Sequence, residues 1–151
     1  MRYIRDDRGQ SMVELALLLP ILVFTLIGGA DLARAYAIQL AVQNGTRAGA
    51  EAAAINYPFT LTESSIKTRT IDEMDRTPGM TAANAVITVT FKQLDGVTTC
   101  TDPPSPTTPC YATVRVRYTF RTVTPWPLIP NIANFDRSTT MRTIKGGTLP
   151  P

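Results

Sequence analysis

The sequence predicts an α+β protein in which a long N-terminal helix packs on a small antiparallel sheet with one additional helix. The first observation is an uncharged apolar run, Leu15 to Ala30, after which apolar residues keep recurring at helical spacing. The second is the alternation of apolar and polar residues in two later segments, which is typical of half-buried strands. A chain of 151 residues allows a membrane helix and one small domain.

The apolar run is long enough to approach the thickness of a membrane. Leu15 to Ala30 measures about 24 Å as a helix, and adding Ser11 to Val13 brings it towards the roughly 30 Å of the hydrocarbon core. We therefore expect a transmembrane segment over residues 12–30, within a helix over residues 10–55. Pro20 lies inside the run and cannot donate a backbone hydrogen bond, so a helix kink is expected there.

Charges on either side of the run predict its orientation. Three arginines precede it, Arg2, Arg5 and Arg8, whereas the first cation after it is Arg34. The positive-inside rule then places the N-terminus in the cytoplasm and the domain of residues 56–151 outside the inner membrane. Asp31 and Arg34 are spaced to pair across one turn, and we expect an exposed pair that marks the membrane exit and adds little stability.

Beyond the membrane segment the helix is predicted to be amphipathic. Its apolar positions recur every three or four residues: Ile38, Ala41, Val42, Gly45, Ala48, Gly49 and Ala52. The positions expected on the opposite side are polar: Gln39, Gln43, Thr46, Arg47 and Glu51. Because the apolar face is mostly Ala and Gly, another backbone can approach it closely, either the sheet of the same chain or a neighbouring helix.

The outer domain is predicted to contain one helix and three strands. A capping box, Thr60 to Glu63, opens a helix that continues to about Arg76. Alternation predicts strands around Ile87 to Phe91 and Ala112 to Phe120, joined as an antiparallel pair, and a third strand is expected around Ser138 to Ile144.

Two cysteines, Cys100 and Cys110, flank a proline-rich stretch between the first two strands. Zinc would need carboxylates for half its ligands here, which is a poor match to structural zinc sites. We expect a disulfide, which implies an oxidising compartment outside the cytoplasm. Trp126 lies between prolines, and we favour packing on the sheet over an exposed docking patch or a position at the membrane interface.

Composition argues against several functional classes. The chain has no histidine, which excludes a histidine-based catalytic triad. Its acids form no arrangement expected of an enzyme, and its cations are scattered rather than clustered with aromatic residues. We expect a non-enzymatic protein without metal, cofactor, small-molecule substrate or nucleic acid.

The N-terminal motif resembles a known family. Gly9 is followed five residues later by Glu14 and then by the uncharged run, and the segments Asp31 to Ala35 and Asn44 to Ala50 continue the likeness. Together they resemble the TadE-like pseudopilins of tight-adherence (Flp) pilus systems. A carboxylate at the edge of a membrane-length helix is by default a functional residue.

The resemblance implies a processing and assembly route. A prepilin peptidase would remove the leader, residues 1–9, and leave Gln10 as the mature N-terminus. Glu14 would then face the new amine of a neighbouring subunit, an ion pair strengthened by low dielectric. The implied partners are the major Flp-type pilin, companion pseudopilins and the inner-membrane assembly platform.

Two alternatives remain open at this point. The chain could keep its N-terminus as an uncleaved signal anchor, or signal peptidase could cut after Gly28-Gly29-Ala30 and release a secreted protein. Mature N-termini at Gln10, Met1 and Asp31 distinguish the three readings.

Overall fold

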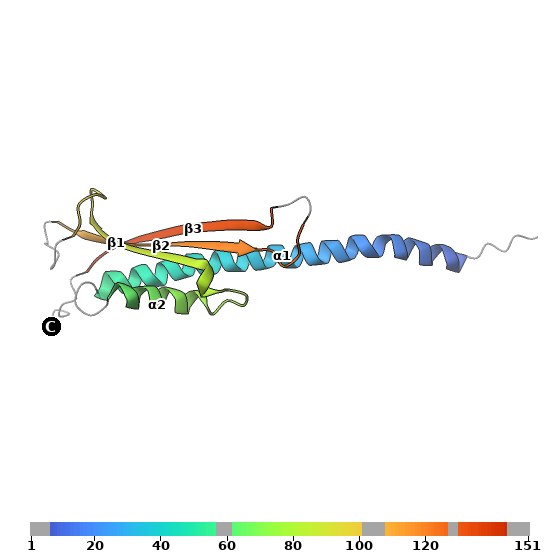
Figure 1. The fold of residues 1–151 in the computed structure, drawn as a ribbon, viewed down its shortest axis with the longest axis horizontal. Coiled ribbons are helices and arrows are strands. Elements are labelled where there is room, and N and C mark those ends of the chain that lie inside the picture. The colour runs from blue at the N-terminus through green and yellow to red at the C-terminus, as the bar shows by residue number, and fades with distance from the viewer. Residues whose placement is uncertain (1–6, 57–61, 101–107, 127–129, 145–151) are drawn as a thin grey trace, which may run out of the picture.

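The computed structural model describes residues 7–56, 62–100, 108–126 and 130–144. In chain order its elements are α1 (Asp7–Asn56), α2 (Glu63–Met74), the 3-10 helix η1 (Ala82–Asn84), β1 (Ala85–Gln93), β2 (Cys110–Arg121) and β3 (Ile132–Arg142). The α+β prediction is confirmed. Figure 1 shows that α1 extends along the whole molecule, with α2 and the sheet packed beside its C-terminal half and its N-terminal half projecting alone.

The sheet has the order β1-β2-β3, and both pairings are antiparallel. Alternation places the even-numbered residues of β2 in the core, as its sequence predicts. The third strand was predicted too late: β3 begins at Ile132, and Ile144 lies beyond its end. Its alternation is weak because an exposed arginine, Arg137, occupies a position between the half-buried Phe135 and Thr139.

Helix α2 is confirmed, but its start was assigned to the wrong residue. Thr62 is extended and its hydroxyl oxygen accepts a hydrogen bond from the Ser65 backbone nitrogen at 3.4 Å, so Thr62 is the N-cap. The predicted cap, Thr60, lies outside the described residues. The helix ends at Met74, earlier than the predicted Arg76, because a turn begins at Asp75.

Small residues let α1 approach α2 closely. A Cβ atom at Gly49 would lie 2.1 Å from the Thr70 hydroxyl and 3.3 Å from a Val114 methyl, and one at Gly45 would lie 2.4 Å from the Met74 side chain. The stripe of small residues therefore serves both expected neighbours, the helix and the sheet, within one chain.

One residue expected on the outer side of α1 is in the core. Thr46 is 1% exposed, and its hydroxyl donates to the Gln43 carbonyl at 2.8 Å and accepts from the Thr139 hydroxyl at 3.0 Å. Because α1 contacts α2 and the sheet at once, its buried surface is wider than a single apolar stripe. The Thr46 hydroxyl thus both donates and accepts a hydrogen bond, so its burial leaves no polar group unsatisfied.

Replacing Gly49 by alanine should destabilise the domain. Overpacking costs about 1–3 kcal/mol, and alanine gains roughly 1 kcal/mol over glycine inside a helix. Because the added methyl group would overlap the Thr70 side chain, we expect a cost in the upper part of that range and a net loss of stability. Thermal unfolding of the full chain in detergent, followed by circular dichroism, measures this difference. The matched control is Gly29→Ala, where a Cβ would meet nothing within 4 Å. A Gly49→Ala protein as stable as the control would contradict the packing argument.

Candidate functional site

The N-terminal part of α1 is an apolar segment that the domain leaves uncovered. We call residues 9–30 the exposed segment. Its large side chains are open to the surroundings, with Leu26 76% exposed. By length and composition α1 can cross a membrane, and its most apolar window has a mean hydropathy of 2.2 and is not covered by the rest of the structure.

The predicted processing and assembly residues lie together at the start of this segment. Helix α1 begins at Asp7 and runs without interruption through Gly9, Gln10 and Glu14. The Gln10 side-chain amide donates to the Glu14 carboxylate at 3.1 Å, and Glu14 is exposed. A neutral amide neighbour does not neutralise the carboxylate, so its charge is available to a partner.

Pro20 does not end the helix. Helical structure continues on both sides of it, although its nitrogen cannot donate to the Ala16 carbonyl. The predicted kink at this position stays a prediction.

At the C-terminal end of the exposed segment, Asp31 connects α1 to the chain that follows β2. Its carboxylate accepts hydrogen bonds from the Val123 nitrogen at 3.2 Å, the Thr124 nitrogen at 3.4 Å, the Trp126 indole nitrogen at 3.2 Å and Arg34 at 3.2 Å. We call these five residues the Asp31 anchor. The donors come from segments more than ninety residues apart in sequence from Asp31, apart from Arg34.

The anchor corrects the prediction that Asp31 and Arg34 form an exposed ion pair that adds little stability. The Asp31–Arg34 pair exists, but Asp31 is only 6% exposed. Arg34 also lies over the Phe120 ring, 5.8 Å from its centroid. Burial alone would raise the pKa of Asp31, but the hydrogen bonds from Val123, Trp126, Thr124 and Arg34 together outweigh it and lower the pKa below its ordinary value.

Trp126 packs mainly on α1 and not on the sheet as favoured above. Its ring lies over Gly28, with 3.4 Å between a ring carbon and the position of a Cβ, and its centroid is 6.3 Å from that of Phe24. Its backbone nitrogen donates to the Asn131 side chain at 2.6 Å. Beside the ring is an open apolar groove of about 300 Å³ that also touches Leu32 and Phe120. The preference of proline-flanked Trp126 for the helix follows from the Asp31 acceptor, which its local sequence does not reveal.

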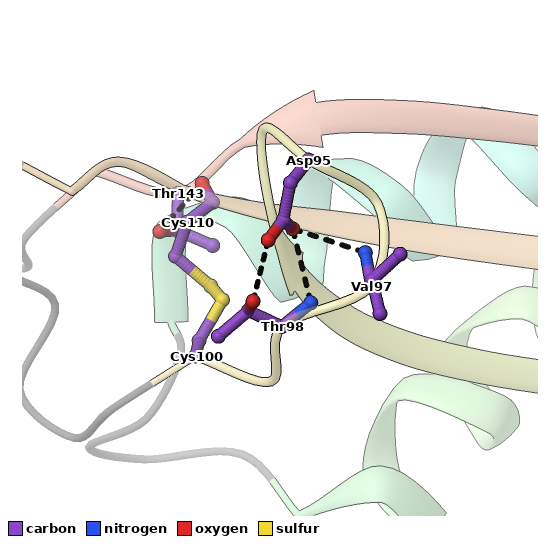
Figure 2. The surroundings of a disulfide bond; sticks show 6 residues. All are labelled: Asp95, Val97, Thr98, Cys100, Cys110 and Thr143. Atoms are coloured by element: carbon purple, nitrogen blue, oxygen red, sulfur yellow. Dashed lines mark hydrogen bonds between the residues drawn. A yellow bond between two sulfur atoms is a disulfide. The ribbon is translucent and has the colours of Figure 1, made fainter.

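The predicted disulfide is present at the other end of the domain. Cys100 and Cys110 are joined, and Figure 2 shows the bond beside the turn that follows β1. In that turn Asp95 accepts hydrogen bonds from the Thr98 hydroxyl and from the nitrogens of Val97 and Thr98, at 3.0 Å each for the nitrogens. These bonds, the hydroxyl first, lower the pKa of Asp95. Closing so short a loop stabilises the fold by about 2–3 kcal/mol on the chain-entropy model.

Comparison with known proteins supports the likeness of the helix. The family model of the TadE-like protein matches residues 9–51, which lie wholly within α1 and include Gly9, Glu14 and the Asp31–Arg34 pair. No curated protein and no solved structure matches the chain. The match confirms the resemblance drawn from the N-terminal motif.

Asp31→Asn should weaken the attachment of the domain to α1. Asparagine keeps the size of the side chain but removes the charge that four donors share, and hydrogen bonds to charged groups contribute about 1.5–3 kcal/mol each. Because Trp126 is the only tryptophan, its fluorescence reports the anchor directly. We expect red-shifted emission and a lower unfolding temperature for this variant in detergent. Asp72→Asn, an exposed carboxylate on α2, is the control, and equal spectra for both variants would contradict the assignment.

The same contact should respond to acid. The pKa of Asp31 in the folded protein lies below its unfolded value of 3.8. The carboxylate therefore stabilises the fold fully above that unfolded value and loses its contribution as the pH falls through the lower folded pKa. A fluorescence titration should show a Trp126 transition below pH 3.8 in the unaltered protein. The Asp31→Asn variant should lack that transition, and its retention there would assign the step to other carboxylates.

Proposed function

We propose, from the match of residues 9–51 to the TadE-like family model, that the chain is a TadE-like protein of tight-adherence pilus systems and acts as a non-enzymatic pseudopilin-like subunit. In this proposal a prepilin peptidase cuts after Gly9, and the mature chain joins pilus assembly through its N-terminal helix. The major Flp-type pilin, companion pseudopilins and the membrane platform are its proposed partners.

The observation that carries the proposal is the division of α1 at Asp31. Within residues 9–30 the helix exposes large apolar side chains and one carboxylate, Glu14. After Asp31 one face of the helix is covered by its own domain, while the other face stays exposed. An exposed apolar helix needs either lipid or other helices around it. A pilus subunit meets both conditions in turn, first in the membrane and then among its neighbours.

The alternatives predict different uses of the same residues. If the chain is an uncleaved signal anchor, no newly formed N-terminal amine is available to pair with Glu14. In a protein cut after Ala30, Glu14 and Pro20 are discarded and the mature chain begins at Asp31, the residue that fixes the domain to α1. Release there would also remove Phe24 and Gly28 from the Trp126 contact.

Gly9→Val should block processing. A Cβ at Gly9 would meet nothing within 4 Å, so the substitution leaves the fold of the chain unchanged and acts through recognition by the peptidase. Intact mass of the membrane-extracted protein, from cells that contain the peptidase, gives the result. We expect a mature chain starting at Gln10 for the unaltered protein and an unprocessed chain for the variant.

The control for this experiment is Gly29→Val, at a second helical glycine whose Cβ would also meet nothing within 4 Å. It should be processed normally at Gln10. A chain that starts at Asp31, or one that still loses the leader in the Gly9→Val variant, would rule out the proposed cleavage.

Glu14→Gln should impair assembly while sparing insertion. Removing the charge does not hinder insertion of the helix, because a neutral amide is less unfavourable than a carboxylate at the edge of the hydrocarbon core. In the assembled state it leaves the partner amine unpaired in a dry environment, which weakens association by about 3–5 kcal/mol. Pilus yield and co-purification with the other pilins, at equal membrane levels, measure the effect. Glu51→Gln, an exposed glutamate on the covered half of α1, is the matched control, and equal yields from the two variants would refute the ion-pair role.

A further inference from the structure

The outer face of the sheet, turned away from α1 and α2, is polar and basic. Figure 1 shows both helices on the opposite side of the strands. The outward positions of the three strands carry five exposed cations, Lys92, Arg115, Arg117, Arg121 and Arg142. Among the described residues of these strands, the one outward carboxylate is Asp136. The face therefore has a clear excess of positive charge.

The strand register arranges these cations in rows that alternate with hydroxyl groups. Three neighbouring rows contain Lys92 with Tyr111 and Arg142, then Thr90 with Thr113 and Thr140, then Thr88 with Arg115 and Ser138. Two shallow hollows of about 550 and 600 Å³ lie along them and share Thr90 and Thr113. The result is a continuous shallow trough across the sheet.

Two arginines at one end of the trough are held in place, Arg115 in its last row and Arg117 one row beyond it. Asp136 accepts from Arg115 Nε at 2.8 Å and lies 3.4 Å from Arg117 Nε. Asp136 thus fixes the planes of both guanidinium groups and uses part of their N–H donors. A guanidinium group has five such donors, so a second acceptor can bind at the rest. At the other end of the trough Lys92 and Arg142 flank the half-buried residue Tyr111. The carboxylate of Asp95, in the turn after β1, offsets part of the Lys92 charge.

We propose that this outer face binds an anionic polysaccharide. Arginine and lysine match the carboxylates of such a chain, the threonine and serine hydroxyls match its hydroxyl groups, and Tyr111 offers an apolar surface to a sugar ring. The shallow trough suits an extended polymer. This binding is independent of the proposed role in pilus assembly.

An acidic protein is a poorer occupant. Protein interfaces concentrate binding energy in a central apolar or aromatic cluster. The large apolar side chains that the described strands expose on this face, Val86 and Ile132, lie at the end nearer the Asp31 anchor. Among the described lining residues of the trough, the one large exposed aliphatic side chain is Leu94, which does not make a cluster.

The test uses the full chain in detergent micelles, with polygalacturonate as the probe, neutral dextran as the uncharged comparison and double-stranded DNA as the competing polyanion. The variant is Lys92→Gln with Arg142→Gln. Its matched control is Arg47→Gln with Arg69→Gln, which removes the same charge from exposed positions on α1 and α2. Circular dichroism and an intact Cys100–Cys110 bond verify that both variants are folded.

We expect polygalacturonate to bind the unaltered chain and dextran not to bind. Losing two charge-assisted contacts should weaken binding at least about tenfold in the sheet variant, while the helix control stays within about twofold, since net charge alone is a weak and salt-screened effect. Equal losses in the two variants, unchanged binding in the sheet variant, or tighter binding of DNA than of polygalacturonate would each overturn the proposal.

Discussion

The carboxylate of Asp31 is the contact on which the arrangement of the molecule depends. A carboxylate that is 6% exposed would be strongly unfavourable without partners. Here it has four, and they come from α1 itself and from the segment that follows β2. Because backbone nitrogens and an indole N–H must all point at one side chain, the end of β2 nearer the exposed segment has a fixed position on α1. The domain thus begins at a defined point along the helix.

The two halves of α1 differ in side-chain size as well as in exposure. Large residues such as Leu17 and Leu26 project freely before Asp31, whereas after it Gly45 and Gly49 bring α2 and the sheet to within contact of the helix backbone. Large side chains maximise contact with lipid or neighbouring helices, and small ones allow close packing within the chain. One helix therefore has two different surfaces: the domain covers one face of it after the anchor, although Leu32 and Tyr36 are still exposed there.

Local patterns were sufficient to predict most elements. Alternation identified β1 and β2, the spacing of Ala and Gly identified the close approach to α1, and the isolated cysteines identified the disulfide, because each signal is contained in a short stretch of sequence. The misassigned features depend on distant residues. Nothing near Asp31 reveals that Val123, Thr124 and Trp126 will supply donors, and nothing near Trp126 identifies its acceptor. Thr46 was misplaced for a similar reason, since its hydroxyl is satisfied by Thr139 of β3.

The spacing between Glu14 and Asp31 determines where the Glu14 carboxylate lies in a bilayer, and this position can be compared with its surroundings in a bundle of helices. The two residues are about 26 Å apart along a helix, close to the roughly 30 Å of a hydrocarbon core. In a bilayer with Asp31 at one interface, Glu14 lies near the other, where a side chain can reach water and a charge is least unfavourable. In a bundle of helices outside the membrane no such water is close, and the same carboxylate requires a cation. Under the proposed role in pilus assembly, the position of Glu14 would make its charge tolerable in the bilayer and require a partner afterwards. The demand for the neighbouring amine would then arise only once the subunit leaves the lipid.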